Sequence, residues 1–255
     1  MEETISKKKK LLLIALAVLV AIVAFTFIAF GIYVGDYYHA DDAAIEAFAY
    51  DESKFYESTD SDENIVFAPK EPVAGFIFYP GGKVEQEAYV PLMRALAERG
   101  ILCVLIDVPF NLAILDTDAA EGIKESFDVI EKWYIGGHSL GGSAAAMYVE
   151  KNPGEFDGLI LLAAYSNVDL SDTGMDVISI YGTEDKVLDL EKYEQYRENL
   201  PADFTEEVIS GGCHAYFGMY GLQAGDGIPH ISAEEQIERT VNIIVQNLVG
   251  GAQDK

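Results

Sequence analysis

The chain has 255 residues, half of them hydrophobic, which is enough for one α/β domain with a sizeable core plus an extension. It carries 43 acidic against 17 basic side chains, a formal net charge of −26. This charge argues against the class of proteins that bind nucleic acid through a basic surface, and it disfavours contact with anionic lipid headgroups.

The first element in chain order is an uncharged apolar segment, residues 11–34, which follows four consecutive lysines. As a helix its 24 residues span about 36 Å, more than the bilayer core of about 30 Å. The positive-inside rule then places residues 1–10 in the cytoplasm and the rest of the chain outside the cell. A cleaved signal peptide is the alternative, but its apolar region is usually shorter and ends in a small-residue cleavage site. We therefore expect a single-pass signal anchor in the cell membrane.

Residues 35–62 are expected to form a stalk or the opening elements of the main domain, which we place at residues 63–255. Residues 37–50 have the alanine-rich spacing of a helix, and short runs at residues 55–56 and 64–67 are typical of antiparallel strands. No internal repeat or low-complexity linker divides the remaining sequence, so a single domain is the simplest division.

From residue 73 onward, continuous apolar runs alternate with helical segments. The expected strands lie at residues 73–79, 101–108, 133–135, 158–164, 177–181 and 204–209. The expected helices lie at residues 84–99, within 119–133, and at 143–150, 188–200 and 232–248. This alternation predicts an α/β fold with a mostly parallel sheet and helices on both of its faces.

Residues 137–141 read Gly-His-Ser-Leu-Gly and fit the G-x-S-x-G nucleophile elbow. The motif stands between a strand-like run and a helical segment, where an elbow must turn sharply. That turn raises the hydroxyl of Ser139 above the sheet edge and points the first amides of the helix at the same position. The pattern predicts Ser139 as a nucleophile, with the backbone N–H of Leu140 as one donor to an oxyanion.

A serine nucleophile needs a base that takes its proton and an acid that orients the base, in the chain order Ser, Asp or Glu, His. His39 is close to the apolar segment, and His138 lies inside the motif itself. His214 lies in a glycine-rich loop at the end of the last expected strand, where active-site loops of such sheets are found. His230 is the competitor, but it precedes a helix, where a capping or surface role is sufficient. We expect His214 to be the base.

The acid is expected in the turn after the strand that Gly182 ends. Asp185 comes three residues later and is the favoured candidate, with Glu184 and Asp189 as competitors that could be plain solvated carboxylates. A second oxyanion donor is expected in the loop of residues 80–83, because glycine lets the backbone approach a substrate closely.

In that loop we favour the N–H of Gly82, with Lys83 as the alternative.

With these residues in this order, the sequence resembles the α/β-hydrolase superfamily over residues 64–248. The stretches that carry the resemblance are residues 79–82, 137–142, 182–185 and 211–218.

Within this superfamily the chain is similar to a compact bacterial subgroup with a Pro-Gly-Gly oxyanion loop. The resemblance implies an α/β-hydrolase fold in which Ser139, His214 and Asp185 act as nucleophile, base and orienting acid. It implies hydrolysis of ester or related acyl bonds through an acyl-enzyme, with no cofactor and no metal. Only residues 165–175 fill the place where many relatives insert a cap, so we expect an open site.

We expect the walls of this site among two sets of loop residues, although aromatic side chains in such loops more often pack into the core. The expected wall residues are Tyr216, Phe217, Met219, Phe110, Asn111 and Leu112.

The sequence thus predicts a membrane-anchored serine hydrolase, carboxylesterase-like, that acts on a small-molecule ester or acyl substrate outside the cell and has no nucleic-acid partner. A catalytically inactive surface binding protein on the same scaffold is the alternative from another class. The same triad would also serve amide, thioester or lipid acyl bonds. The sequence specifies neither the natural substrate nor the oligomeric state.

Overall fold

The computed structural model describes residues 7–250, and the chain divides into two compact units between Tyr37 and Tyr38. The first unit contains helix α1 (Lys7–Gly35), which buries none of its side chains within the protein, and an 18-residue stretch of this helix has a mean hydropathy of 3.2. Its length and composition would allow it to cross a membrane. The helix expected at residues 11–34 is therefore confirmed, and it begins four residues earlier than the uncharged segment.

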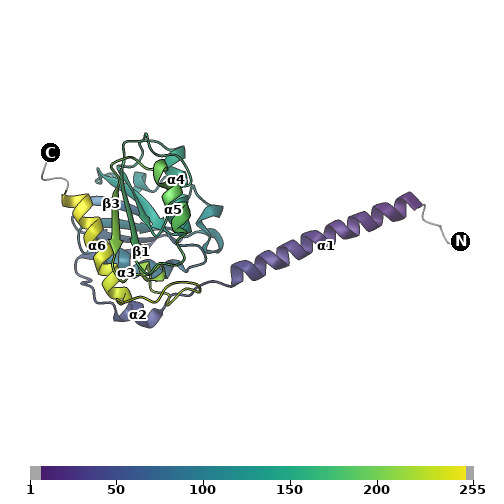
Figure 1. Ribbon diagram of the computed structural model, residues 1–255, viewed down its shortest axis with the longest axis horizontal. Coiled ribbons are helices and arrows are strands. Elements are labelled where there is room, and N and C mark those ends of the chain that lie inside the picture. The colour runs from purple at the N-terminus through teal and green to yellow at the C-terminus, as the bar shows by residue number, and fades with distance from the viewer. Residues whose placement is uncertain (1–6, 251–255) are drawn as a thin grey trace. The chain divides into compact units, whose positions relative to one another are not determined.

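The second unit is built around one eight-stranded sheet with the order β1-β2-β4-β3-β5-β6-β7-β8 (Figure 1). Strands β1 and β2 pair antiparallel with each other and β2 pairs antiparallel with β4, while all other pairs are parallel. The strands are β1 (Phe55–Thr59), β2 (Ile65–Pro69), β3 (Ala74–Tyr79), β4 (Ile101–Leu105), β5 (Trp133–His138), β6 (Gly158–Leu162), β7 (Asp176–Gly182) and β8 (Thr205–Ile209). The predicted mostly parallel α/β sheet is confirmed.

Helices cover both faces of this sheet because the central strands are apolar on both sides. In β3, Phe76 and Phe78 pack on the face covered by α3 (Val90–Ala97) and α6 (Ala233–Gly250). The alternate residues Ile77 and Tyr79 belong to the core on the other face, to which α4 (Leu140–Lys151) contributes. Two shorter helices, α2 (Asp42–Ala47) and α5 (Leu190–Tyr196), complete the α-helices of the described chain.

Some helical segments are shorter than the sequence predicts, or absent. Residues 119–132 form turns and one short 3-10 helix, Lys124–Ser126, in place of a longer helix. Gly122 interrupts this segment with a φ of +77°, which lies outside the helical region. The hydroxyl of Tyr79 also holds the loop directly, because it accepts a hydrogen bond from the N–H of Ala120 at 3.0 Å and donates one to the carbonyl of Thr117 at 2.7 Å.

The chain that precedes the sheet is packed into the second unit from Tyr38 onward. Tyr38 forms a parallel β-bridge with Val84, just beyond the end of β3. Further along, α2 begins at a cap in which Asp41 accepts a hydrogen bond from the N–H of Ala44. Most of the segment expected as a stalk or as opening elements, residues 38–62, therefore lies against the domain.

Candidate active site

Ser139 occupies the turn between β5 and α4, at the carboxyl end of a central strand. Its φ and ψ are +52° and −119°, a backbone conformation that non-glycine residues rarely adopt. Such a conformation costs about 1–3 kcal/mol and persists only where the surroundings enforce it. Here the N–H of Ser139 donates to the carbonyl of Leu162 in β6 at 2.8 Å, which ties the turn to the neighbouring strand.

Two glycines of the motif allow three backbone segments to meet below the serine. A Cβ on Gly137 would lie 2.5 Å from the carbonyl carbon of Gly141 and 2.6 Å from the carbonyl oxygen of Tyr79. A Cβ on Gly141 would lie 2.3 Å from the carbonyl oxygens of both Tyr79 and Pro80. Because all of these contacts are with backbone, no side-chain rotation relieves them, and only glycine fits at either position.

Replacing Gly137 with alanine is expected to destabilise the domain by about 3 kcal/mol, because overpacking against fixed backbone must displace β3 or α4. The matched control is Gly31→Ala in α1, where an added Cβ would meet nothing within 4 Å. Chemical denaturation of the full chain in detergent measures both. Equal stability of the two variants would contradict the close approach of strand and helix.

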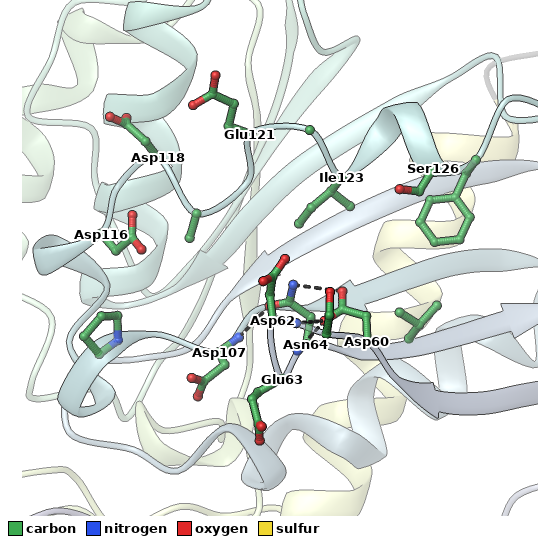
Figure 2. A pocket seen from close by; sticks show the side chains of 16 residues that line it. Asp60, Asp62, Glu63, Asn64, Asp107, Asp116, Asp118, Glu121, Ile123 and Ser126 are labelled. Atoms are coloured by element: carbon green, nitrogen blue, oxygen red, sulfur yellow. Dashed lines mark hydrogen bonds between the residues drawn. The ribbon is translucent and has the colours of Figure 1, made fainter.

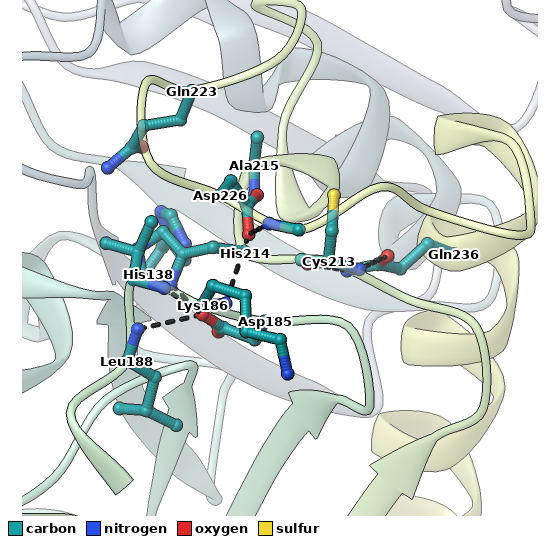
Figure 3. A network of polar contacts seen from close by, with 12 residues as sticks. His138, Asp185, Lys186, Leu188, Cys213, His214, Ala215, Gln223, Asp226 and Gln236 are labelled. Carbon is teal, nitrogen blue, oxygen red and sulfur yellow. Dashed lines mark hydrogen bonds and ion pairs between the residues drawn. The ribbon is translucent and has the colours of Figure 1, made fainter.

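Asp185 and His214 form a buried pair on the loops that follow β7 and β8 (Figure 3). Oδ2 of Asp185 lies 2.9 Å from Nδ1 of His214, and neither side chain is more than 2% exposed. The other carboxylate oxygen of Asp185 accepts hydrogen bonds from the N–H groups of Val187 at 2.9 Å and Leu188 at 2.8 Å. The carboxylate is thus fixed by its own turn and in turn orients the imidazole.

Nε2 of His214 is the reactive end of this pair. Nδ1–H of His214 can donate to Asp185, which leaves the lone pair on Nε2. Nε2 is buried and has no hydrogen-bond partner within residues 7–250. His214 and Ser139 both line a cavity of about 310 Å³. A buried polar atom without a partner is costly, and one that borders a cavity with a serine suits a base that accepts a proton during a reaction.

Two residues that sequence reasoning missed hold the histidine loop in place (Figure 3). Asp226 accepts hydrogen bonds from the N–H of Ala215 at 2.9 Å and from the N–H of Lys186 at 3.3 Å, so it joins the histidine loop to the acid loop. Gln236 in α6 accepts from the N–H of Cys213 at 2.9 Å and donates to its carbonyl at 2.8 Å. The only sequence signal for Asp226 is its position between two glycines, which indicates a turn.

The loop of residues 80–83, after β3, lies against the start of α4. A Cβ on Gly82 would be 2.9 Å from Cδ2 of Leu140, so these two residues are immediate neighbours. The N–H groups on either side of Gly82 are engaged: Gly81 donates to the hydroxyl of Tyr89 at 3.0 Å, and Lys83 donates to the carbonyl of Asn111 at 2.7 Å.

The N–H of Gly82 makes no hydrogen bond with any residue that the structure describes. Leu140 is the first residue of α4, so its N–H has no acceptor within the helix. These two neighbouring donors are therefore available to a ligand, whereas Lys83, the alternative that the sequence left open, has its N–H committed elsewhere.

His138 supports this loop from below, a role that sequence reasoning did not assign. It is buried, and its Nδ1 lies 2.8 Å from the hydroxyl of Tyr89, the same hydroxyl that accepts the N–H of Gly81. The ring of His138 lies 4.6 Å from that of His214, centroid to centroid. Burial, and secondarily the neighbouring His214, hold the pKa of His138 well below its usual range, so it is neutral at physiological pH.

This neutral histidine predicts a specific loss of stability in mild acid. Below about pH 6.5 the unfolded chain protonates His138 while the folded chain does not, so the free energy of unfolding falls by up to about 1.4 kcal/mol per pH unit. In His138→Asn the amide oxygen can still accept from Tyr89, but no proton is taken up. Between pH 7 and pH 5 we therefore expect the variant to lose up to about 2 kcal/mol less than the wild type. Parallel denaturation profiles over this range would contradict a neutral His138.

The competing residues lie outside this arrangement. The side chain of His230 is 71% exposed and approaches Glu184, with Nδ1 3.9 Å from Oε1. Glu184 also accepts a hydrogen bond from the hydroxyl of Thr183 at 3.1 Å. Asp189 lines the edge of the cavity, but its carboxylate accepts the N–H of Lys192 and caps α5.

The cavity walls differ from those that the sequence suggested. None of the six expected wall residues lines the cavity that contains Ser139. Phe217, Met219 and Leu112 are buried in the core instead. The apolar part of the lining comes from Leu140 and from the segments that follow β6 and β7, namely residues 163–165 and 187–188.

A second, larger cavity of about 750 Å³ is acidic and shares no lining residue with the cavity of Ser139 (Figure 2). Asn64 organises one wall, because it accepts from the N–H of Asp107 at 2.9 Å and donates to Asp60 at 3.0 Å. Desolvation raises the pKa of Asp107 above its usual value. Among residues 7–250 no group of three or more histidine, cysteine, aspartate or glutamate side chains is arranged to hold a metal ion. The carboxylates that line the cavity are Asp60, Asp62, Glu63, Asp107, Asp116, Asp118 and Glu121.

Comparison with known proteins agrees with this fold. The sequence model of a family described as "Alpha/beta hydrolase family" matches residues 75–238. No curated protein matches the chain significantly.

Two of the solved structures that resemble the chain are TT1662 from Thermus thermophilus and a dienelactone hydrolase from Anabaena variabilis. TT1662 has a TM-score of 0.57 and 14% identity, over 76% of this chain and 98% of its own. The dienelactone hydrolase has a TM-score of 0.56 and 13% identity, over 74% of this chain and 96% of its own. At these identities the likeness concerns the fold alone.

Proposed function

This chain belongs to the alpha/beta hydrolase family, and we propose that it is a membrane-anchored serine hydrolase of the carboxylesterase type. One observation carries the proposal: the buried Asp185–His214 pair leaves Nε2 of His214 without a partner in the cavity that Ser139 also lines. A scaffold used only for binding has no need for an oriented, unpartnered imidazole in the same cavity as a serine with a strained backbone.

In the proposed reaction, Nε2 of His214 takes the proton of Ser139 while Oγ attacks the carbonyl carbon of an ester. The resulting tetrahedral intermediate collapses, the ester C–O bond breaks, and His214 passes its proton to the leaving alkoxide. A water molecule then attacks the acyl-enzyme in the same way, which releases the acid and restores Ser139. Asp185 keeps the imidazole in the required tautomer and stabilises its charged form.

The N–H groups of Gly82 and Leu140 are the proposed oxyanion donors. Two free backbone donors from adjacent segments can stabilise the negative charge that develops on the carbonyl oxygen. The link from Gly81 through Tyr89 to His138 supports this role, because it restrains the loop in the absence of substrate. A preorganised donor does not have to be positioned during the reaction.

The cavity beside Ser139 is small, so it can enclose only the part of a substrate next to the reacting carbonyl. Its volume of about 310 Å³ is at the lower end of the range for small-molecule sites, and its walls combine apolar side chains with polar ones. The connection between β6 and β7 is too short to form a cap over it. We therefore favour an open esterase site, with amide or thioester bonds as substrates that the same chemistry would serve.

Labelling with a fluorophosphonate probe tests this proposal directly. The full chain in detergent is expected to react at Ser139, since such probes modify serines that an adjacent base activates. Peptide mapping identifies the modified residue. If the folded protein fails to react, the scaffold is better explained as a catalytically inactive surface binding protein.

The location of the enzyme is a separate proposal. The four lysines at the start of α1 and its uncharged length support a cytoplasmic N-terminus, with the catalytic domain outside the cell. Protease added to intact cells is then expected to degrade the domain. Full protection in intact cells, together with degradation after lysis, would reverse the orientation.

A further inference from the structure

We infer that the natural substrate is an acyl ester held in a lipid membrane and cleaved at the membrane surface. This inference rests on the proposed serine hydrolase function and on α1 as a membrane anchor. The observation that leads to it is the position at which the chain leaves α1 and joins the domain.

Only two residues separate the end of α1 at Gly35 from Tyr38, the first residue of the second unit. The N–H of Tyr38 donates to the carbonyl of Lys83 at 2.7 Å, and the carbonyl of Tyr38 accepts the N–H of Glu85 at 3.0 Å. Three extended residues span at most about 11 Å, however the two units are arranged. The covalent chain therefore limits how far the residue after Gly82 can lie from the end of the anchor.

Further contacts hold residues 38–41 on the domain, so this segment does not detach and lengthen the connection to α1. The N–H of Ala40 donates to Oε2 of Glu85 at 2.7 Å, and the N–H of Asp41 donates to the carbonyl of Met219 at 2.8 Å. The hydroxyl of Tyr38 accepts the N–H of Ala224 at 3.0 Å. The segment of residues 38–41 is thus held both by the strand end that carries the oxyanion loop and by the loop that follows His214.

Exposed apolar side chains occur on the two loops that contact this region. Ile114 and Leu115 follow Asn111, whose carbonyl accepts the N–H of Lys83. Leu222 lies between Met219 and Ala224, the two residues that bind the segment of residues 38–41. Large apolar side chains exposed near a membrane anchor can enter the lipid interface.

The open cavity explains why a membrane-resident ester suits this site. Moving an acyl chain out of the bilayer costs about 0.8 kcal/mol per methylene group, unless the enzyme supplies an apolar tunnel of its own. No cap covers the cavity among the described residues. The arrangement with the lower free-energy cost therefore leaves the acyl chain of the substrate in the bilayer and places Ser139 at the ester group. Residues 36–255 carry a net charge of −28, which favours neutral or zwitterionic lipids over anionic ones.

A spacer inserted into the tether tests the inference. About 20 glycine and serine residues placed between Asp36 and Tyr37 leave every contact of Tyr38 intact but remove the distance limit. The full chain is reconstituted in phosphatidylcholine vesicles that contain a neutral long-chain ester of a fluorogenic alcohol. Because effective concentration falls steeply with tether length, hydrolysis of this ester should drop on the order of tenfold. Hydrolysis of a water-soluble short-chain ester should not change.

A second comparison examines the apolar loops themselves. Leu115→Ser combined with Leu222→Ser should lower hydrolysis of the vesicle ester about threefold or more, because each loses apolar area at the interface. Val129→Ser is the matched control. Its side chain is 80% exposed, and it precedes β5 at the end of the strand opposite Ser139. It should leave both activities unchanged.

The outcomes distinguish failure of the membrane-substrate inference from failure of the proposed serine hydrolase function. Equal activity of the spacer variant and the wild type on the vesicle ester would overturn the inference, and so would cleavage of the soluble ester alone. If neither ester is cleaved and the fluorophosphonate does not label Ser139, the serine hydrolase proposal itself fails, and the inference fails with it.

Discussion

Replacing Ser139 with alanine is expected to reduce kcat/KM for ester hydrolysis by a factor on the order of 10⁴ to 10⁶, as removal of a nucleophile from such a triad commonly does. The proposed mechanism has no other group that can form the acyl-enzyme. What remains should come from the oxyanion donors and from substrate binding alone. Steady-state kinetics with a soluble ester measures the loss, and fluorophosphonate labelling should disappear with it.

Stability separates this result from simple unfolding. Alanine keeps the Cβ of serine, and the backbone hydrogen bond from residue 139 to Leu162 does not involve the side chain. The free energy of unfolding should therefore change by less than about 1 kcal/mol. Ser171→Ala is a suitable control, because this serine is only half-buried and its hydroxyl donates to neighbouring Asp169, away from the cavity of Ser139. Near-full activity of the Ser139 variant would refute the assignment of the nucleophile.

The sheet was predictable because its central strands are continuous apolar runs, and such runs indicate a buried strand from the sequence alone. All six residues of β3 are buried, and the corresponding apolar run is visible in the chain without any tertiary information. The missing helix at residues 119–132 shows where this reasoning fails. Helical spacing is a weak preference, and there the loop is held by a hydrogen-bonded hydroxyl of Tyr79, 41 positions away in sequence from Ala120.

The candidate site likewise contains residues that the sequence identifies and residues that only the fold reveals. Ser139 lies in a motif of consecutive residues, and the expected positions of Asp185 and His214 follow from strand order, so the sequence was sufficient to name them as candidates. Tyr89 and Asp226 act through partners that only the fold brings close. The hydroxyl of Tyr89 contacts His138, which is 49 positions away in sequence, and no short sequence motif predicts such a contact.

The second large effect is expected at His214. His214→Ala removes the proposed base and leaves the Asp185 carboxylate buried without its partner. We expect kcat to fall by a factor on the order of 10⁴ to 10⁶, together with a loss of stability of about 3 kcal/mol from the unpaired buried charge. His230→Ala should change neither quantity appreciably, because that side chain is exposed. A collapse of activity in the His230 variant would identify it as the base instead.

A double variant distinguishes a shared mechanism from two independent contributions. If Ser139 and His214 act as one unit, Ser139→Ala combined with His214→Ala should be no slower than the more damaged single variant, since the second change removes a function already lost. Multiplication of the two effects would mean that His214 assists catalysis by a route that does not pass through Ser139. The kinetics of the three variants on one soluble ester decide between these cases. They do so without knowledge of the natural substrate, because the proton transfer from Ser139 to His214 is required for any ester that the site accepts.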